Sequence, residues 1–303
     1  MNVNFFIPTL FAVVFAPLIL GIINRTKAFF GGRCGQPLLQ LYYDLFKLLR
    51  KGATYSKTTT YIFRLGPMVG LVCALLATTL VPFGSQRPFI SFSGDILLFA
   101  YLLGLMRFFT VIAALDTGSS FEGMGAAREV HFSALAEVAF FLGLISLVKI
   151  TSFASFSEIY STSFANLWDM KSIEMILIGS SFLIVLLTEN ARIPVDDPNT
   201  HLELTMIHEV MVLDHSGPDF AFILYGSALK LWVLGSVFVQ TFWPIRSGCV
   251  YLDVLFAFLS MIVLGVIIGI VESTMARLRL LRVPQLLVAG AALSTVALVL
   301  TMR

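Results

Sequence analysis

Charge is the scarcest property of this sequence. Only 13% of its 303 residues are Asp, Glu, Lys or Arg and 58% are hydrophobic, whereas an ordinary soluble domain carries about 25% charged residues. So few charges cannot cover a globule in water, and the mean hydropathy of +0.91 excludes a disordered chain. The apolar residues fall in runs of about 20, the length of a spanning helix, without the alternation of barrel strands. We therefore expect an all-α, polytopic membrane protein.

Cysteine is scarce as well. The three cysteines, Cys34, Cys73 and Cys249, stand far apart and form no C-x-x-C pair. The chain therefore lacks the four thiolates of an iron–sulfur cluster, and no disulfide framework is implied. The net charge of +2 is too small to suggest nucleic-acid binding. We expect no redox cofactor in this chain and no nucleic-acid partner.

Apolar runs predict about eight spans in a single integral membrane domain, residues 1–303. The runs cover residues 5–23, 65–83, 96–114, 132–148, 173–188, 220–243, 252–271 and 285–301. No Lys or Arg precedes the first run, and Arg25, Lys27 and Arg33 follow it. This is the reverse of the charge order of a signal peptide, so we expect a retained span.

The basic residues are distributed unequally between the odd-numbered loops, which lie on one side of the membrane in an eight-span chain, and the even-numbered loops and termini, which lie on the other side. Two lie inside spans, most of the others lie in the odd-numbered loops, and the even side holds only Arg87, Lys149, Lys171, Arg246 and Arg303. Because cytoplasmic loops are enriched in Lys and Arg, the odd loops are expected in the cytoplasm and both termini outside.

The first of these loops contains an amphipathic pattern at residues 38–51. Its apolar residues recur at helical spacing: Leu38, Leu41, Leu45, Leu48 and Leu49. The pattern predicts a helix that is either an interfacial anchor with snorkelling lysines or a docking surface for a partner, and the two roles can coexist.

Three charged residues lie within predicted spans: Arg107, Glu137 and Lys230. An ionisable group near the bilayer centre costs about 3 kcal/mol even on lenient insertion scales. Such residues are candidates for function, for instance in ion movement. The alternative is a buried structural pair, such as Arg107 with Glu137.

Acidic residues concentrate between positions 189 and 219, where Arg192 is the one Lys or Arg. The acids are Glu189, Asp196, Asp197, Glu203, Glu209, Asp214 and Asp219. The residues between them are too apolar for a solvated loop, so we expect the segment to fold into the protein at the membrane surface. Helix capping is an alternative role for Glu203 after Thr200, and for Glu122 after Ser119.

Histidine motifs in this segment do not indicate a metal site. His208 and Glu209 begin an H-E-x-x-H pattern, but its fifth position is Val212, which excludes a zincin site. His201, His208 and His215 recur every seven residues in a loop. We expect them on a polar helix face rather than as haem ligands.

Several spaced motifs together resemble subunit 1 of respiratory complex I over nearly the whole chain. They are RCGQP at 33–37 with DLFKL at 44–48, DTGS at 116–119, GAARE at 125–129 with Glu137 beyond it, ENARIPVD at 189–196 and ESTMARLR at 272–279. The run PVDDPNTHLELTMIHE at 194–209 looks instead like the homologous subunit of membrane-bound [NiFe] hydrogenases, including the formate hydrogenlyase type. The shorter loop at 33–48 puts a quinone-access cavity in doubt.

The resemblance implies a membrane-anchor and coupling subunit in a prokaryotic plasma (inner) membrane. Its expected partners are hydrogenase-like large and small subunits, an iron–sulfur protein and antiporter-like membrane subunits. The [NiFe] centre and the iron–sulfur clusters would belong to the partners. A relay of charge or protons is expected at Arg107, Arg128, Glu137, Glu189, Arg192, Asp196, Glu203, Glu209, Asp214 and Lys230. Docking of the peripheral arm is expected at Arg33, Asp44, Lys47, Arg277 and Arg279.

Two other functions fit parts of the same pattern. One is subunit 1 of a NADH:quinone oxidoreductase, whose odd-numbered loops form part of a quinone site. The other is an ion-coupled transporter that uses Arg107, Glu137 and Lys230, although the sequence has neither the inverted repeat nor the broken helices typical of transporters.

Overall fold

The computed structural model describes residues 6–161, 164–196, 206–244 and 247–302. Within these ranges it contains helices and no β-strand, and eight of the helices are long and apolar enough to span a membrane, as predicted. The spanning helices are α1 (Ile7–Phe30), α3 (Tyr61–Leu80), α4 (Asp95–Asp116), α5 (Ser120–Thr151), α8 (Ser172–Glu189), α9 (Gly217–Phe242), α10 (Val250–Thr274) and α11 (Val283–Thr301). The all-α, multi-pass architecture is therefore confirmed.

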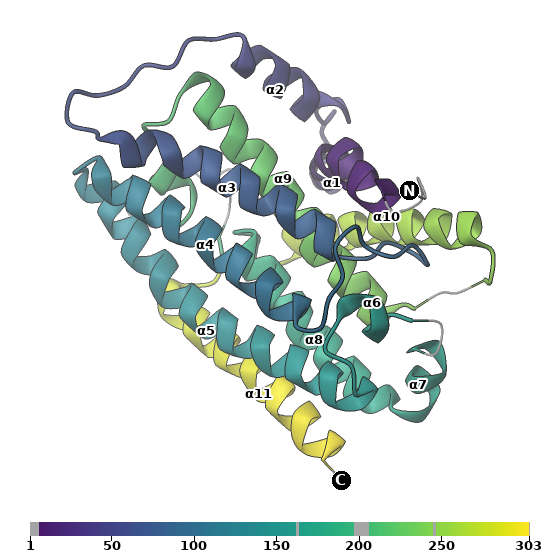
Figure 1. Ribbon diagram of the computed structural model, residues 1–303. Coiled ribbons are helices and arrows are strands. Elements are labelled where there is room, and N and C mark those ends of the chain that lie inside the picture. The colour runs from purple at the N-terminus through teal and green to yellow at the C-terminus, as the bar shows by residue number, and fades with distance from the viewer. Residues whose placement is uncertain (1–5, 162–163, 197–205, 245–246, 303) are drawn as a thin grey trace.

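The long helices pack as neighbours that are often distant in sequence. Helix α11 lies against α5 and α8, α3 lies between α4 and α9, and α1 packs on α10 (Figure 1). Segments 50–60, 116–119, 190–196 and 275–279 gather at one end of the bundle. The short helices α6 (Phe156–Ile159) and α7 (Phe164–Met170) lie at the other end (Figure 1).

Helix α5 is longer than its apolar run. At a rise of 1.5 Å per residue, its 32 residues extend for roughly 48 Å, against a hydrocarbon core of about 30 Å. The hydrophobic run predicts only residues 132–148 of this helix, because its first three turns are polar. Those turns carry Arg128 and Glu129, and Ala126 within them is buried in an apolar cluster with Val111 and Ala114 of α4.

The predicted amphipathic helix is α2 (Gln40–Leu49), which packs against α1 and α9 (Figure 1). The close contact with α1 requires Gly21, because a Cβ there would lie 2.1 Å from the Leu38 carbonyl oxygen. The Tyr42 hydroxyl donates to the Val14 carbonyl of α1. The N-terminal end of α2 is therefore fixed to α1.

A proline in α1 explains why this helix also accepts a hydrogen bond from α9. Pro17 lies inside that helix and has no N–H to donate to the Val13 carbonyl. The Tyr225 hydroxyl of α9 donates to this oxygen instead, at 2.7 Å. Helices α1, α2 and α9 thereby become one side wall of the site described next.

Candidate functional site

The charges predicted inside the spans join into one network with the last residue of α8. The Arg107 guanidinium in α4 lies 2.6 Å from the Glu137 carboxylate in α5 and 2.8 Å from the Glu189 carboxylate. Glu189 also lies 2.8 Å from Nζ of Lys230 in α9. Four helices thus contribute one charge each, two positive and two negative. The suggested pairing of Arg107 with Glu137 is present, within a larger network.

Three of the four charged side chains in this network are buried, so each of them needs a partner of opposite charge. The side chains of Arg107, Glu189 and Lys230 are 10% exposed or less. Removing one partner of a buried ion pair destabilises a protein by about 3–5 kcal/mol, since the other charge is left alone. Glu137 differs, because its side chain is 41% exposed in a groove between α4 and α5. The network therefore reaches the outer face of the bundle at Glu137.

A second ion pair connects the segment after α8 to the loop between α10 and α11. Asp196 Oδ1 lies 2.7 Å from Nη2 of Arg277. Its other oxygen accepts the backbone N–H groups of Ile207 at 3.0 Å and His208 at 3.2 Å. The buried Asp196 carboxylate therefore holds residues 207 and 208 of the acidic segment close to the residues that directly follow α8.

Glu272 forms a third junction, at the end of α10. Its carboxylate lies 2.8 Å from Lys27 of α1 and 3.3 Å from Arg192. A negative charge near a helix C-terminus is unfavourable because the helix dipole is negative there. Two cations compensate for this position, and they fix the segment after α8 against α1 and α10.

The GAARE motif holds the acidic segment against α5. The Arg128 guanidinium donates to the Met206 carbonyl at 2.9 Å. A Cβ at Gly125 would lie 2.2 Å from a Val210 methyl group and 2.9 Å from the Ile207 carbonyl oxygen. Glycine is therefore needed for the 3-10 helix η2 (Glu209–Val212) to approach α5 this closely.

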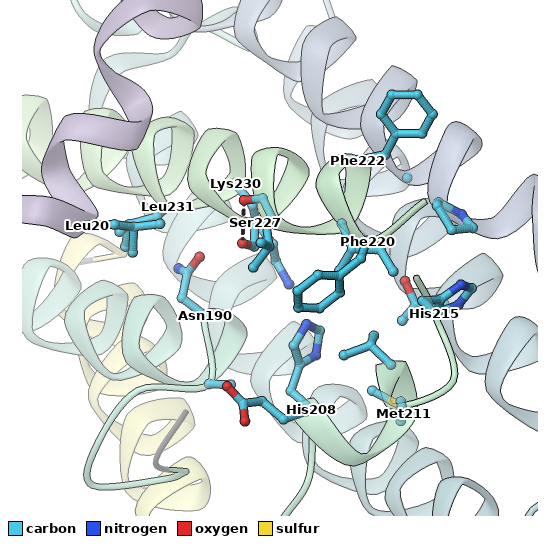
Figure 2. A pocket seen from close by; sticks show the side chains of 18 of the residues that line it. Leu20, Asn190, His208, Met211, His215, Phe220, Phe222, Ser227, Lys230 and Leu231 are labelled. Carbon is cyan, nitrogen blue, oxygen red and sulfur yellow. Dashed lines mark hydrogen bonds between the residues drawn. The ribbon is translucent and has the colours of Figure 1, made fainter. Parts of the chain in front are cut away.

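A cavity of about 710 Å³ lies between these charged groups and α1, α2, α3 and α9. Its walls include Leu41 and Asp44 of α2, and the expectation about quinone access at this loop stays a prediction. Figure 2 shows Phe220 of α9 facing His208 and Met211 across this space. The lining thus combines apolar side chains with the buried charges.

Two histidines lie in the cavity wall. Burial, together with the nearby charge of Lys230, lowers the pKa of His208 to about 4. Burial also lowers the pKa of His215 to about 4, and its ring stacks on Phe63 with centroids 3.9 Å apart. Both are therefore neutral near pH 7. The predicted polar helix face is wrong for both, because the described part of this segment forms only η2 and turns, and His201 lies outside the described residues.

Other predicted relay residues occupy different positions. Glu209 lines the cavity, whereas Asp214 is exposed and its N–H donates to the Glu122 carboxylate at 3.3 Å. Ser119 precedes α5, but its side chain makes no capping hydrogen bond, so Glu122 does not act in the predicted capping box. Glu203 lies outside the described residues, and both its relay and its capping roles stay predictions.

The predicted docking residues separate into two groups. Arg33, Lys47 and Arg279 are exposed. The Asp44 carboxylate accepts a hydrogen bond from Gln40 at 2.9 Å, and Arg277 is directed inward to Asp196. Arg277 therefore belongs to the ion pair with Asp196 rather than to the exposed docking residues.

Sequence reasoning missed Lys27, Glu129 and Glu272 as site residues. Lys27 counted only toward loop charge, and the other two appeared only inside motifs. The available signal was that Glu272 follows a long apolar run, where an unpaired carboxylate is unfavourable. Among the described residues, no group of three or more His, Cys, Asp or Glu is arranged to hold a metal ion.

The fold and this network define a polytopic helical membrane protein with a charged interior. The sequence model of the NADH dehydrogenase family matches residues 3–302. The chain belongs to this family.

Curated proteins similar to this chain include subunits of hydrogenase-type complexes. The chain is 32% identical to formate hydrogenlyase subunit 4 of Escherichia coli (strain K12), over 93% of this chain and 92% of that protein. It is 30% identical to hydrogenase-4 component C of the same organism, over 94% and 91%. Identity falls to 26% with a subunit of the NADH-quinone oxidoreductase of Neisseria meningitidis, over 65% of this chain and 55% of that one.

A solved structure shows the same fold. A chain of the membrane-bound sulfane sulfur reductase, an archaeal respiratory membrane complex, superposes with a TM-score of 0.85 over 98% of both chains. The sequence identity is 18%, so this likeness describes the fold alone.

Proposed function

We propose that this chain is the membrane-anchor and coupling subunit of an energy-converting oxidoreductase complex. It docks a peripheral arm resembling a [NiFe] hydrogenase, with large and small subunits and an iron–sulfur protein. It transmits redox-linked charge changes to antiporter-like membrane subunits that move ions. The similarity to formate hydrogenlyase subunit 4 and hydrogenase-4 component C supports this assignment.

The observation that carries the proposal is the network of Arg107, Glu137, Glu189 and Lys230. A charge change at one end of such a network alters the protonation of the next pair, because buried charges are weakly screened. Near Glu189, Asp196 supplies a second buried carboxylate, and both line one small cavity. The network therefore offers a path from the segment after α8 into the spans.

The partly exposed Glu137 sets the direction of transmission. A carboxylate exposed within a span is unfavourable against lipid. We therefore place an antiporter-like subunit against the α4–α5 groove, where it covers Glu137. The exposed Arg33, Lys47 and Arg279 serve the arm at the cytoplasmic end of the bundle.

Redox chemistry belongs to the partners in this proposal. The [NiFe] centre and the iron–sulfur clusters lie in the arm, and the residues of this chain hold and move charge. The proposed location is the inner membrane of a prokaryote, with both termini outside.

Glu137→Gln in the intact, reconstituted complex tests the coupling role. Gln keeps the size of the side chain and part of its hydrogen bonding but removes the titratable proton. We expect the variant to assemble, and ion uptake per turnover to fall at least about tenfold, as for loss of an acid–base group. Glu158→Gln is the matched control, because Glu158 is exposed on α6 at the opposite end. Unchanged uptake in Glu137→Gln contradicts the proposal.

The cavity favours a second candidate function, subunit 1 of a quinone reductase. A cavity of about 710 Å³ falls within the usual range for small-molecule sites, roughly 300–1,000 Å³. Co-purification of the complex with bound quinone, or loss of its activity with a quinone-site inhibitor, would support this function. Identification of a nickel-containing large subunit in the purified complex would support the hydrogenase-type assignment.

A further inference from the structure

Glu129 of α5 is a carboxyl group that the network does not neutralise. It lines the large cavity and also a small cavity shared with Glu189 and Asp196. Its side chain makes no ion pair or hydrogen bond within the described residues. The neighbouring Arg128 guanidinium donates to the Met206 carbonyl instead.

The other carboxyl groups on the cavity wall have partners. Glu189 is held by Arg107 and Lys230, and Asp196 by Arg277 and two backbone N–H groups. An ion-paired carboxylate is kept in its charged form. A carboxyl group without a partner, next to water, can gain and lose a proton.

The cavity is large enough to supply that water. At a share of about 30 Å³ for each molecule in the liquid, about 710 Å³ holds roughly 20 water molecules. Polar groups from several elements line it and can anchor the water. They include Asp44 of α2, Arg107 of α4, Glu189 of α8, Asp196 and His208 of the following segment, and Lys230 of α9.

The position of Glu129 connects this water to the buried ion pairs. The charges that act on it include those of Lys230, Glu189, Arg107 and Asp196. Glu137 follows eight residues later on the same helix, a rise of about 12 Å. Glu129 therefore lies on the cavity wall beside the network, three of whose members, Arg107, Glu189 and Lys230, line the same cavity.

We propose that Glu129 is the carboxyl group that exchanges protons between cavity water and the network of Arg107, Glu137, Glu189 and Lys230. In the step, a hydronium ion gives its proton to a Glu129 carboxylate oxygen, an O–H bond forms there, and water remains. No electron moves. When Glu129 is charged it attracts Lys230, and when it is neutral Lys230 is left to Glu189. The inference deepens the coupling function proposed above and rests on it.

The test uses the intact complex with Glu129→Gln, Glu129→Asp and the control Glu158→Gln. pH-difference infrared spectra detect the carbonyl band of a protonated carboxyl group, which shifts in D₂O. We expect the band of one titrating group to be lost in Glu129→Gln, kept in Glu158→Gln, and moved in frequency in Glu129→Asp. This readout does not depend on coupling, and a packing role would leave the band in place.

Ion uptake then separates this inference from the proposed function. We expect uptake per turnover to fall at least about tenfold in Glu129→Gln and to recover in part in Glu129→Asp. Loss of uptake in Glu137→Gln alone, with the Glu129→Gln spectrum unchanged, overturns the role of Glu129 and leaves the coupling function intact. Unchanged uptake in both variants overturns the coupling function. If Glu129→Gln does not assemble, Glu129→Asp decides, because an unmoved band in that variant contradicts the inference.

Discussion

The Asp196 carboxylate and the Arg277 guanidinium, 81 positions apart in the sequence, form an ion pair at 2.7 Å. The pair joins the segment after α8 to the loop between α10 and α11. The two motifs that contain these residues, ENARIPVD and ESTMARLR, are therefore parts of one site. Their spacing in the sequence gives no sign of this contact.

Arg277→Gln is expected to destabilise the complex by about 2 kcal/mol, the range for loss of a hydrogen bond to a charged group. Asp196 stays buried in the variant and keeps only its two backbone donors from the contacts described above. Thermal inactivation of the purified complex measures the effect, and a second change, Asp196→Asn, should restore part of the loss. Arg279→Gln is the control, because Arg279 is exposed. Equal losses in the two arginine variants would mean that the ion pair does not stabilise the protein.

The eight spans could be predicted because a run of about 20 apolar residues is a local signal that tertiary contacts rarely override. The apolar run predicted only residues 132–148 of α5, since hydropathy reports only the part of a helix inside the membrane, whereas the S-x-x-E spacing at Ser119 and Glu122 indicated the start of the helix. The partners in the ion pairs could not be predicted from the sequence either. Lys27 and Glu272 are 245 positions apart, and only the packing of α1 on α10 brings them to 2.8 Å.

The prediction that the repeated histidines lie on one polar helix face was wrong for a different physical reason. A seven-residue spacing places side chains on one face only if the chain between them is helical. Residues 206–216 instead form one 3-10 turn, held by Asp196 and Arg128. Contacts from other elements, rather than local propensity, decide the shape of this segment.

The orientation of the chain can be measured by cysteine labelling. Cys34 and Cys249 are exposed and Cys73 is buried, so all three are first replaced by serine. Single cysteines then replace Lys51, Arg279 or Lys171. The bias of basic residues predicts that the first two react from the cytoplasmic side and the third from outside. Labelling of Lys171→Cys only from inside contradicts the eight-span topology.

Docking of the arm is expected to depend on exposed cations near α2. Charge reversal at Arg33 or Lys47 changes residues that are exposed in this chain, so insertion and folding should be unaffected. We expect Arg33→Glu with Lys47→Glu to release the arm from isolated membranes. The release is measured by the fraction of arm subunits that stays with the membrane after washing. Lys171→Glu, at the opposite end, is the control. Full retention of an active arm would mean that these cations only anchor the chain to lipid.

The stability of the complex is expected to fall in acid because of His215. Its pKa is lowered to about 4 by burial, against 6.5 for the ordinary group. Between these values the unfolded chain binds more protons, so the stabilisation present above pH 6.5 is lost as the pH falls toward about 4. A shift of this size corresponds to at most about 3 kcal/mol.

His215→Phe removes the titrating group and keeps an aromatic ring against Phe63. We expect the variant to lose less stability than the wild-type complex between about pH 7 and about pH 5, measured as the change in thermal inactivation temperature. His131→Phe is the matched control, because His131 is exposed on α5. It should lose as much stability as the wild type. An acid loss in His215→Phe that equals the wild-type loss would show that this ring contributes nothing to the pH dependence.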